Sequence, residues 1–327
     1  MRCLVTGAGG FLGGHLVRAL RARGDFVAGL HRDAGWGRLT DRFIGGEGAR
    51  AREAAPSVTL WGDLGLNLSS SMVERAIADY QIDTVFHLAA QTQVSTAESD
   101  PRGTFDANVC GTQAVLEACR QQKVKHYIQA SSDKVYGDGP APYAESQPVS
   151  ASGHYATTKA MADLLAQAYA RDFKVPVAIT RCGNLYGPGF LNFSTLIAGA
   201  IKSAIRGERF VIRSDGMPRR DYLHVADAVD GYLRLADQGA VGIFNFGTGR
   251  PSSALEVVRA VEAAVGGKLD VEVLGGAAGE IRDQWLDAGK ARKVLEWKPS
   301  RGLDTGLRET VPWYREFFGR AAAKEIG

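Results

Sequence analysis

A short apolar segment, a glycine-rich turn and an amphipathic segment follow one another at the start of the chain, and this order constrains the fold more than any other feature. Residues 2–6 have the composition of a buried strand, and residues 15–23 carry apolar side chains at helical spacing. Between them, Gly7 permits a tight turn, Gly10 lets backbone approach a pyrophosphate, and Gly13 lets the helix pack closely on the strand. A lone glycine pattern is typical of a loop, but this context predicts a dinucleotide-binding strand–turn–helix unit.

The tip of the second predicted strand bears on which dinucleotide is bound. Residues 26–30 form this strand, and His31, Arg32 and Asp33 follow it. An NAD site usually has an acid here for the ribose 2′-hydroxyl, whereas a cation suits the 2′-phosphate of NADP. His31 and Arg32 therefore favour NADP slightly over NAD, although Asp33 could still reach the ribose. The alternative is that Arg32 and Arg38 belong to a solvated loop.

Predicted strands and helices then alternate along the chain. The strands are expected at 58–61, 83–88, 125–131 and 175–181, and the helices at 70–80, 102–121 and 152–172. This alternation predicts an α/β fold with a Rossmann-type doubly wound parallel sheet. Gly, Pro and Asn clusters after residue 181 indicate a smaller C-terminal substrate-binding lobe. We assign residues 1–181 and about 222–247, with a returning strand at 242–247, to the dinucleotide-binding domain, and about 182–221 and 248–327 to the lobe.

Charge, hydropathy and cysteine usage exclude several classes of protein. The chain of 327 residues has 39 basic and 36 acidic side chains, a balance that does not indicate a nucleic-acid surface. Its apolar runs are shorter than the roughly 20 residues that a membrane span needs. The four cysteines lack metal-ligand spacing and lie in apparent core segments. We expect a cytoplasmic protein without a metal site, a membrane contact or a nucleic-acid partner.

Tyr155 and Lys159 are the strongest candidates for chemistry. Residues four apart share one face of a helix, and an ammonium held beneath a phenol is expected to lower the phenol pKa. Such a Tyr can take a proton from an alcohol as a hydride leaves the same carbon. Ser132 supplies a hydroxyl that can bond the same oxygen. A chance Tyr-x-x-x-Lys pair on a helix surface is the alternative, and the N-terminal nucleotide pattern argues against it.

Taken together, these motifs resemble those of the extended short-chain dehydrogenases/reductases of the NAD-dependent epimerase/dehydratase family, which act on nucleotide sugars. The resemblance runs from the glycine turn to about Trp313. Beyond Tyr155 and Lys159, it rests on five further segments: His87-Leu88-Ala89-Ala90-Gln91, Asn108-Val109-x-Gly111-Thr112, Arg181-Cys182-Gly183-Asn184-Leu185-Tyr186-Gly187-Pro188-Gly189, Arg220-Asp221-Tyr222-Leu223-His224-Val225-x-Asp227 and Gly279-Glu280-Ile281-Arg282.

The resemblance implies two sets of binding residues. NAD or NADP would be bound by Gly7, Gly10, Phe11, Leu12, Gly13, His31, Arg32, Asp63, Leu64, Leu88, Ala89, Ala90, Asn108, Tyr155 and Lys159. A nucleotide-diphosphate sugar would be bound by Gln91, Asn184, Arg220 and Arg282. Two arginines suit the diphosphate because a planar guanidinium pairs with phosphate oxygens in a bidentate manner.

The residues after Ser132 bear on the type of reaction. Ser132-Asp133-Lys134 most resembles the CDP-glucose 4,6-dehydratases, whereas sugar 4-epimerases usually have small or neutral residues at these positions. On this interpretation Tyr155 deprotonates the sugar 4-hydroxyl as the C4 hydride leaves. Lys134 then removes the C5 proton and Asp133 helps to expel water from C6, which yields a 4-keto-6-deoxy sugar. Alternatively, Asp133 and Lys134 form a structural ion pair.

Three other functions stay open at this point. A nucleotide-sugar epimerase or isomerase would use Ser132, Tyr155 and Lys159 without loss of water, and a 4-keto sugar reductase would use them with NADPH. A cofactor-sensing regulator would need none of the three, so their presence argues against it.

The family also implies a homodimer through a four-helix interface. The predicted helices 102–121 and 152–172 carry apolar residues beyond one face, among them Val109, Ala114, Leu116, Met161, Leu164 and Leu165. Burial of both helices against the sheet is the alternative explanation.

Overall fold

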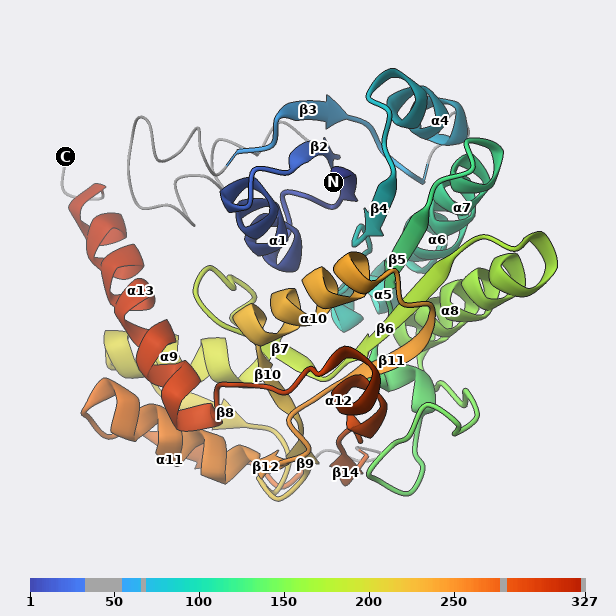
Figure 1. The fold of residues 1–327 in the computed structure, drawn as a ribbon. Coiled ribbons are helices and arrows are strands. Elements are labelled where there is room, and N and C mark those ends of the chain that lie inside the picture. The colour runs from blue at the N-terminus through green and yellow to red at the C-terminus, as the bar shows by residue number, and fades with distance from the viewer. Residues whose placement is uncertain (33–54, 66–68, 277–280, 325–327) are drawn as a thin grey trace.

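The predicted strands assemble into one parallel sheet in the computed structural model, which describes residues 1–32, 55–65, 69–276 and 281–324 (Figure 1). Within these ranges the sheet has seven strands in the order β11-β6-β5-β4-β1-β2-β3, and all neighbours pair in parallel. Their bounds are β1 Arg2–Thr6, β2 Phe26–His31, β3 Val58–Trp61, β4 Thr84–His87, β5 His126–Ala130, β6 Val177–Cys182 and β11 Gly242–Phe246. The predicted Rossmann-type α/β fold is confirmed, as is the strand at 242–247, which returns to the sheet beside β6.

Helices cover both faces of the sheet, which explains why its strands are apolar runs. One face packs against α1 and α10, where Leu16, Phe86 and Tyr232 share a buried core, and the other packs against α4, α7 and α8 around Leu4 and Val115. The bounds of the covering helices are α1 Phe11–Ala22, α4 Ser69–Asp79, α7 Gly111–Gln121, α8 His154–Phe173, α10 Val225–Gln238 and α12 Gly289–Leu295. The first helix thus begins at Phe11 rather than at residue 15, so the glycine turn leads directly into it.

The predicted helix 102–121 is a composite of three helical pieces. After α5 (Val94–Ser99), α6 (Pro101–Phe105) begins with Asp100 as its N-cap and is followed by a π-helical turn, η1 (Asp106–Cys110), that runs into α7. Such π-turns are uncommon in proteins as a whole, and those that occur are often found at functional sites. This one contains Asn108, one of the predicted cofactor residues.

A second group of elements, here called the second lobe, has a buried core of its own. Figure 1 shows α9, α11 and α13 side by side in it, and they share a core that includes Ile201, Val257 and Tyr314. Its helices are α9 Leu196–Arg206, α11 Ala254–Val265 and α13 Leu303–Lys324, and its short strands are β7 Asn184–Tyr186, β8 Phe210–Ile212, β9 Arg219–Arg220, β10 Tyr222–His224, β12 Ser252–Ser253, β13 Val271–Val273 and β14 Asp283–Gln284. That this lobe binds the substrate stays a prediction.

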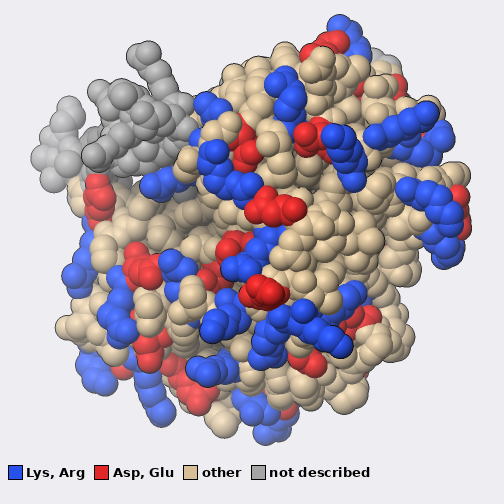
Figure 2. All heavy atoms as spheres, in the orientation of Figure 1, with Lys and Arg blue, Asp and Glu red and all other residues tan. Residues whose placement is uncertain are grey.

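The surface mixes both signs of charge. Figure 2 shows Lys and Arg side chains interspersed with Asp and Glu across the displayed face. Several form ion pairs, such as Arg23 with Asp237 at 2.6 Å and Arg209 with Asp270 at 2.9 Å. Among the described helices, none combines the length and the apolar character that crossing a membrane requires.

Candidate active site

The glycine turn forms a backbone cradle at the carboxyl end of β1. Gly7 has a φ of +67°, a conformation that favours glycine, and Gly10 N–H donates to the Gly7 carbonyl at 2.8 Å. A Cβ on Gly13 would lie 2.1 Å from the Gly7 oxygen, so helix and turn can approach this closely only without a side chain there. Gly10 is the N-cap of α1 without a side-chain acceptor, and the first turn has no acidic residue. The N–H groups of this turn are therefore well suited to a dinucleotide pyrophosphate.

The segment after β4 is held in place by a buried histidine. His87 Nδ1 lies 2.8 Å from Thr6 Oγ1, and His87 Nε2 lies 3.0 Å from Thr112 Oγ1. Ala89 N–H also donates to Thr6 Oγ1 at 3.2 Å, which fixes the start of the Leu88–Ala90 segment. Burial, and to a smaller extent the charge of Lys159, lowers the pKa of His87 to about 3. The imidazole is therefore neutral, and it joins β1, β4 and α7 beneath the cradle.

Asn108 connects the substrate side of the cradle to the helix that carries Tyr155. Its Oδ1 accepts from Gln91 N–H at 2.8 Å, and its Nδ2 donates to the Gln91 carbonyl at 3.0 Å and to Thr158 Oγ1 at 3.0 Å. Thr158 Oγ1 in turn donates to the Tyr155 carbonyl at 2.9 Å. The Gln91 amide nitrogen donates to Thr104 Oγ1 at 3.2 Å. The bonds of Asn108 thus go to protein groups on both sides of the site.

Two predicted cofactor residues follow β2. His31 is buried at the end of the strand, and Arg32 beside it is exposed. Asp33 and Arg38, which the sequence raised as a competing acid and as part of a solvated loop, lie outside the described residues.

Two further predicted cofactor residues follow β3. Asp63 Oδ1 accepts from Gly65 N–H at 2.9 Å, so the carboxylate shapes its own turn. Leu64 is buried against α7, where a Cβ on Gly111 would lie 3.1 Å from the Leu64 Cβ.

Tyr155 and Lys159 lie one turn apart on α8, but the expected direction of the phenol pKa is wrong. The pKa of Tyr155 is raised to about 12, chiefly by burial and also by the negative charge of Asp133, while a hydrogen bond with Ser132 acts in the opposite direction. Lys159 Nζ donates to the Ala130 carbonyl at 2.5 Å rather than to the phenol. The cost of burying a phenolate thus outweighs the charge of Lys159, which the spacing of the two residues suggests as the dominant influence.

Burial also changes the pKa of Lys159. The pKa is lowered to about 8, chiefly because the amine is removed from water, while electrostatic interactions with Asp163 and Cys182 act in the opposite direction. At neutral pH the ammonium form still dominates, but the amine can lose its proton within a narrow range above neutrality. Lys159 is thus positively charged at neutral pH and loses its proton at a lower pH than an ordinary lysine does.

Ser132, Asp133 and Lys134 form one cluster with Asn184 of the second lobe. Ser132 Oγ donates to Asp133 Oδ1 at 3.1 Å, and Lys134 Nζ lies 3.6 Å from the same oxygen. Lys134 Nζ also donates to Asn184 Oδ1 at 3.3 Å. The Asp133 side chain is 2% exposed, and among the described residues its Oδ2 has no hydrogen-bond partner. The ion pair that the sequence left open therefore exists, and it also contacts a predicted substrate residue.

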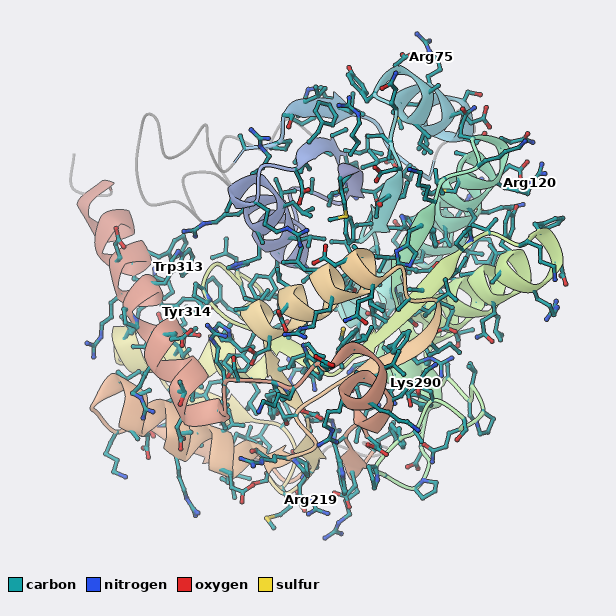
Figure 3. All side chains as sticks on the ribbon, viewed as in Figure 1. Arg75, Arg120, Arg219, Lys290, Trp313 and Tyr314 are labelled. Atoms are coloured by element: carbon teal, nitrogen blue, oxygen red, sulfur yellow. The ribbon has the colours of Figure 1, made fainter. Side chains whose placement is uncertain are left out.

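The two arginines predicted to bind a diphosphate lie close together. Strands β9 and β14 pair in parallel, and Arg220 Nη1 donates to the Arg282 carbonyl at 3.4 Å. Arg219 turns elsewhere: its guanidinium donates to Asp283 Oδ1 at 2.8 Å, and Figure 3 shows it at the lower end of the second lobe. On the β7 side, Asn184 N–H donates to the Asp221 carbonyl at 2.8 Å. The fold thus brings Arg220 to the backbone of Arg282, and the neighbouring Asp221 contacts Asn184 of β7.

A separate cavity of about 330 Å³ opens in the second lobe. None of its lining residues belongs to the predicted catalytic or cofactor set. They come from β10, from the segment after β11 and from the start of α13: Tyr222, Thr248, Arg250, Ser252, Gly302, Leu303, Asp304, Thr305 and Arg308.

Comparison with known proteins identifies the family of the chain. Residues 3–247 match the NAD dependent epimerase/dehydratase family. A UDP-glucose 4-epimerase of Mycolicibacterium smegmatis is 33% identical, with 96% of this chain and 99% of the relative covered. A dTDP-glucose 4,6-dehydratase of the same organism is also 33% identical, covering 96% and 93%. The crystal structure of a dTDP-glucose 4,6-dehydratase from Bacillus anthracis in complex with NAD superposes with a TM-score of 0.83, at 27% identity and 97% coverage of both chains.

Proposed function

Because this chain belongs to the NAD-dependent epimerase/dehydratase family of nucleotide-sugar enzymes, we propose that it is a nucleotide-sugar 4,6-dehydratase that forms a 4-keto-6-deoxyhexose. An epimerase and a dehydratase are equally similar to it, so the side chains at the site must separate the two reactions. The observation that carries the proposal is the contact of Lys134 with both Asp133 and Asn184. This arrangement puts an acid and an amine beside Ser132, which is what elimination of water needs in addition to oxidation.

The proposed reaction uses each member of the cluster once. Tyr155, bonded to Ser132, accepts the proton of the 4-hydroxyl in its phenolate form as C4 loses its hydride. The positive charge of the bound oxidised cofactor would offset the burial that raises the pKa of this phenol. A proton passes from the Lys134 ammonium to the Asp133 carboxylate within their ion pair. The resulting ketone acidifies the C5 proton, which the Lys134 amine then accepts. Asp133 donates a proton to the 6-hydroxyl, which leaves as water. The hydride returns to C6 and a proton returns to C5, so the net change is the loss of one water.

The cradle fits the dinucleotide that this scheme requires. The backbone of Gly10, Phe11 and Leu12 would hold the pyrophosphate, with the buried His87 fixing the Leu88–Ala90 segment beside it. When bound, the oxidised cofactor supplies a hydride acceptor and a positive charge next to the phenol. Tyr155 and Lys159 would face the reacting end, and Asn108 would act by holding the Gln91 backbone.

The substrate diphosphate would lie where the two lobes meet. Asn184 is already bonded to Lys134, Arg220 lies in β9, and Arg282 directly precedes the neighbouring strand β14. Bidentate pairing of guanidinium groups with phosphate oxygens would neutralise the diphosphate. The assignment of Gln91 to the sugar follows from its position after the Leu88–Ala90 segment.

Product analysis by mass spectrometry tests the proposal. Purified protein is incubated separately with CDP-, GDP-, UDP- and dTDP-hexoses, each with NAD+ or NADP+. We expect the mass of one nucleotide sugar to fall by one water, which would also identify the base. A Lys134→Gln variant should lose this product while still reducing the cofactor. Lys125→Gln, which removes an exposed lysine at the start of β5, is the matched control and should behave as the wild type.

A 4-epimerase is the second candidate. Its support is the 33% identity to a UDP-glucose 4-epimerase, together with Ser132, Tyr155 and Lys159, which would serve either reaction. Unchanged product mass with a new sugar isomer in the NMR spectrum would establish it. A 4-keto sugar reductase would instead consume NADPH and add two hydrogens to a 4-keto substrate.

For the cofactor, we propose a slight preference for NADP over NAD within this NAD-dependent family. The support is the exposed Arg32 next to His31 at the end of β2. Replacing Arg32 with Ala should weaken NADP binding and leave the affinity for NAD nearly unchanged. Equal losses for both dinucleotides, measured by isothermal calorimetry, would remove the preference.

We also propose a homodimer built on α7 and α8. Met161 and Leu164 of α8 are 43% and 51% exposed, which is unusual for large apolar side chains on adjacent turns. Leu116 of α7 is buried within its own subunit and contributes nothing to such an interface. The double variant Met161→Glu/Leu164→Glu should convert a dimer to a monomer in analytical ultracentrifugation.

A cytoplasmic location is our further proposal. All four cysteines are free in the described structure, and Cys3, Cys119 and Cys182 are buried. Reduced thiols are typical of cytosolic proteins. Fractionation of the source cells with an antibody to the protein tests this location.

A further inference from the structure

A buried ion pair joins α8 to β6. Asp163 on α8 and Arg181 on β6 are 0% and 1% exposed. Arg181 Nε donates to Asp163 Oδ2 at 2.9 Å, and Arg181 Nη2 donates to Asp163 Oδ1 at 2.9 Å. Gln167 adds a further donor to Oδ1 at 2.7 Å. A bidentate pair of this kind fixes the orientation of the carboxylate, because both oxygens are held at once.

The same carboxylate holds the residue before Ser132. Ser131 Oγ donates to Asp163 Oδ2 at 2.6 Å, and Ser131 N–H donates to the Thr180 carbonyl at 2.8 Å. One residue earlier, the Ala130 carbonyl accepts from Lys159 Nζ. Helix α8 therefore binds two consecutive residues of the segment that leaves β5, through side chains one turn apart.

Spacing along α8 relates this contact to the chemistry. Tyr155, Lys159 and Asp163 follow one another at intervals of four residues, so they share one helical face. Tyr155 works on the substrate with Ser132, Lys159 holds Ala130, and Asp163 holds Ser131. The distance between the Tyr155 phenol and the Ser132 hydroxyl thus depends on the contacts of Lys159 and Asp163 with residues 130 and 131.

We propose that Asp163, oriented by Arg181, is a positioning residue that aligns Ser132 with Tyr155 by holding Ser131 against α8. The inference rests on the proposed function in one respect, namely that Ser132 and Tyr155 are the catalytic residues. Small displacements of catalytic groups carry large rate costs, since a shift of about 1 Å can cost about 100-fold. Asp163 itself touches neither substrate nor cofactor in this scheme.

The Arg181 side of the pair is anchored in turn. Its guanidinium lies 4.7 Å from the centre of the Tyr136 ring, and Tyr136 Oη donates to Asn245 Oδ1 at 2.7 Å. This chain of contacts leads from β11, at the edge of the sheet, to Asp163. The position of the Asp163 carboxylate is therefore fixed by contacts with the sheet as well as by its own helix.

Ser131 is the residue to change, because replacing Asp163 would leave Arg181 buried without its partner and could prevent folding. Ser131→Ala deletes only the bond to Asp163, and Ser131→Thr restores a hydroxyl. Ser300→Ala is the matched control, since Ser300 Oγ donates to the buried Asp227 at 2.7 Å outside this segment. Two quantities are measured: amide hydrogen exchange of peptides covering residues 126–136, and the rate of cofactor reduction by the nucleotide sugar in a single turnover.

We expect Ser131→Ala to speed exchange at Ser131 and Ser132 and to slow cofactor reduction about tenfold. KM for the sugar should change less than twofold, Ser131→Thr should restore both quantities, and Ser300→Ala should alter neither. Wild-type exchange and wild-type rate in Ser131→Ala would overturn the inference, as would an equal loss of rate in Ser300→Ala. A wild-type protein that turns over no nucleotide sugar would contradict the proposed function, while the exchange comparison still decides whether Asp163 holds the strand end.

Discussion

The glycine turn follows the carboxyl end of β1, and the cluster of Ser132, Asp133 and Lys134 follows the carboxyl end of β5. The two sites are built differently. The turn uses backbone from seven consecutive residues, Gly7 to Gly13, and its shape follows from the absence of side chains. The cluster uses side chains from η2 (Asp133–Tyr136), α8 and β7, and its charges depend on burial. A site made of backbone can therefore be predicted from local sequence. The protonation states of a site made of side chains depend on packing, which local sequence does not specify.

The largest expected effect should separate the two regions completely. Tyr155→Phe removes the proton acceptor without disturbing the cradle, so we expect turnover to fall by about 10²–10⁴-fold. The affinity for the dinucleotide, measured by calorimetry, should change less than threefold. A variant that turns over normally would remove Tyr155 from the reaction, and one that loses the cofactor would show that the two regions are not independent.

Lys159 sharpens the comparison through stability. Its pKa is lowered from 10.5 to about 8, so between these values the unfolded chain retains a proton that the folded protein has released. Stability should therefore increase as pH rises from about 8 to 10.5, by up to about 3 kcal/mol from this group. Urea unfolding of the wild type and of Lys159→Met across this range measures the difference. If the free energies of unfolding of the two proteins change equally with pH, burial does not lower the pKa of Lys159.

Asp133→Asn should slow the elimination of water and shift the pH dependence of the oxidation step. Without the acid, elimination should fall by about 100-fold. The carboxylate also raises the pKa of Tyr155, so its loss should move the pH dependence of cofactor reduction to lower pH. Stopped-flow absorbance at several pH values, together with product mass, resolves both effects. Equal slowing of oxidation and elimination would assign Asp133 a merely structural role.

The smallest expected effect concerns the cradle. Gly13→Ala would put a Cβ 2.1 Å from the Gly7 carbonyl, and such overpacking typically costs about 1–3 kcal/mol. Cofactor affinity should fall together with stability, because helix and turn must separate. Gly267→Ala is the control, since a Cβ there meets nothing within 4 Å. Unchanged cofactor affinity in Gly13→Ala would mean that the cradle tolerates side chains.

Much of the fold follows from pattern alone. The strand predicted at 58–61 is found at Val58–Trp61, and the spacing of Tyr155 and Lys159 does place them on one helix. The π-turn at Asp106–Cys110 could not be predicted, because one extra residue in a helix leaves no mark in local composition.

The part of the site that sequence reasoning missed is long-range. Asp163 and Arg181 are 18 residues apart, and they meet only because α8 packs against the sheet beside β6. The role of His87 depends in the same way on Thr6 and Thr112, which come from distant elements. The spacing of Asp163 after Lys159 was the one signal in the sequence that pointed to this pair.

The most direct test of the account follows a single atom. A nucleotide hexose that turns over is prepared with deuterium at C4, and the position of the label in the product is determined by NMR. A dehydratase moves the C4 hydride within the molecule, so we predict deuterium at C6 of a product that has lost one water. Deuterium that returns to C4 of a product of unchanged mass would contradict the account and establish an epimerase.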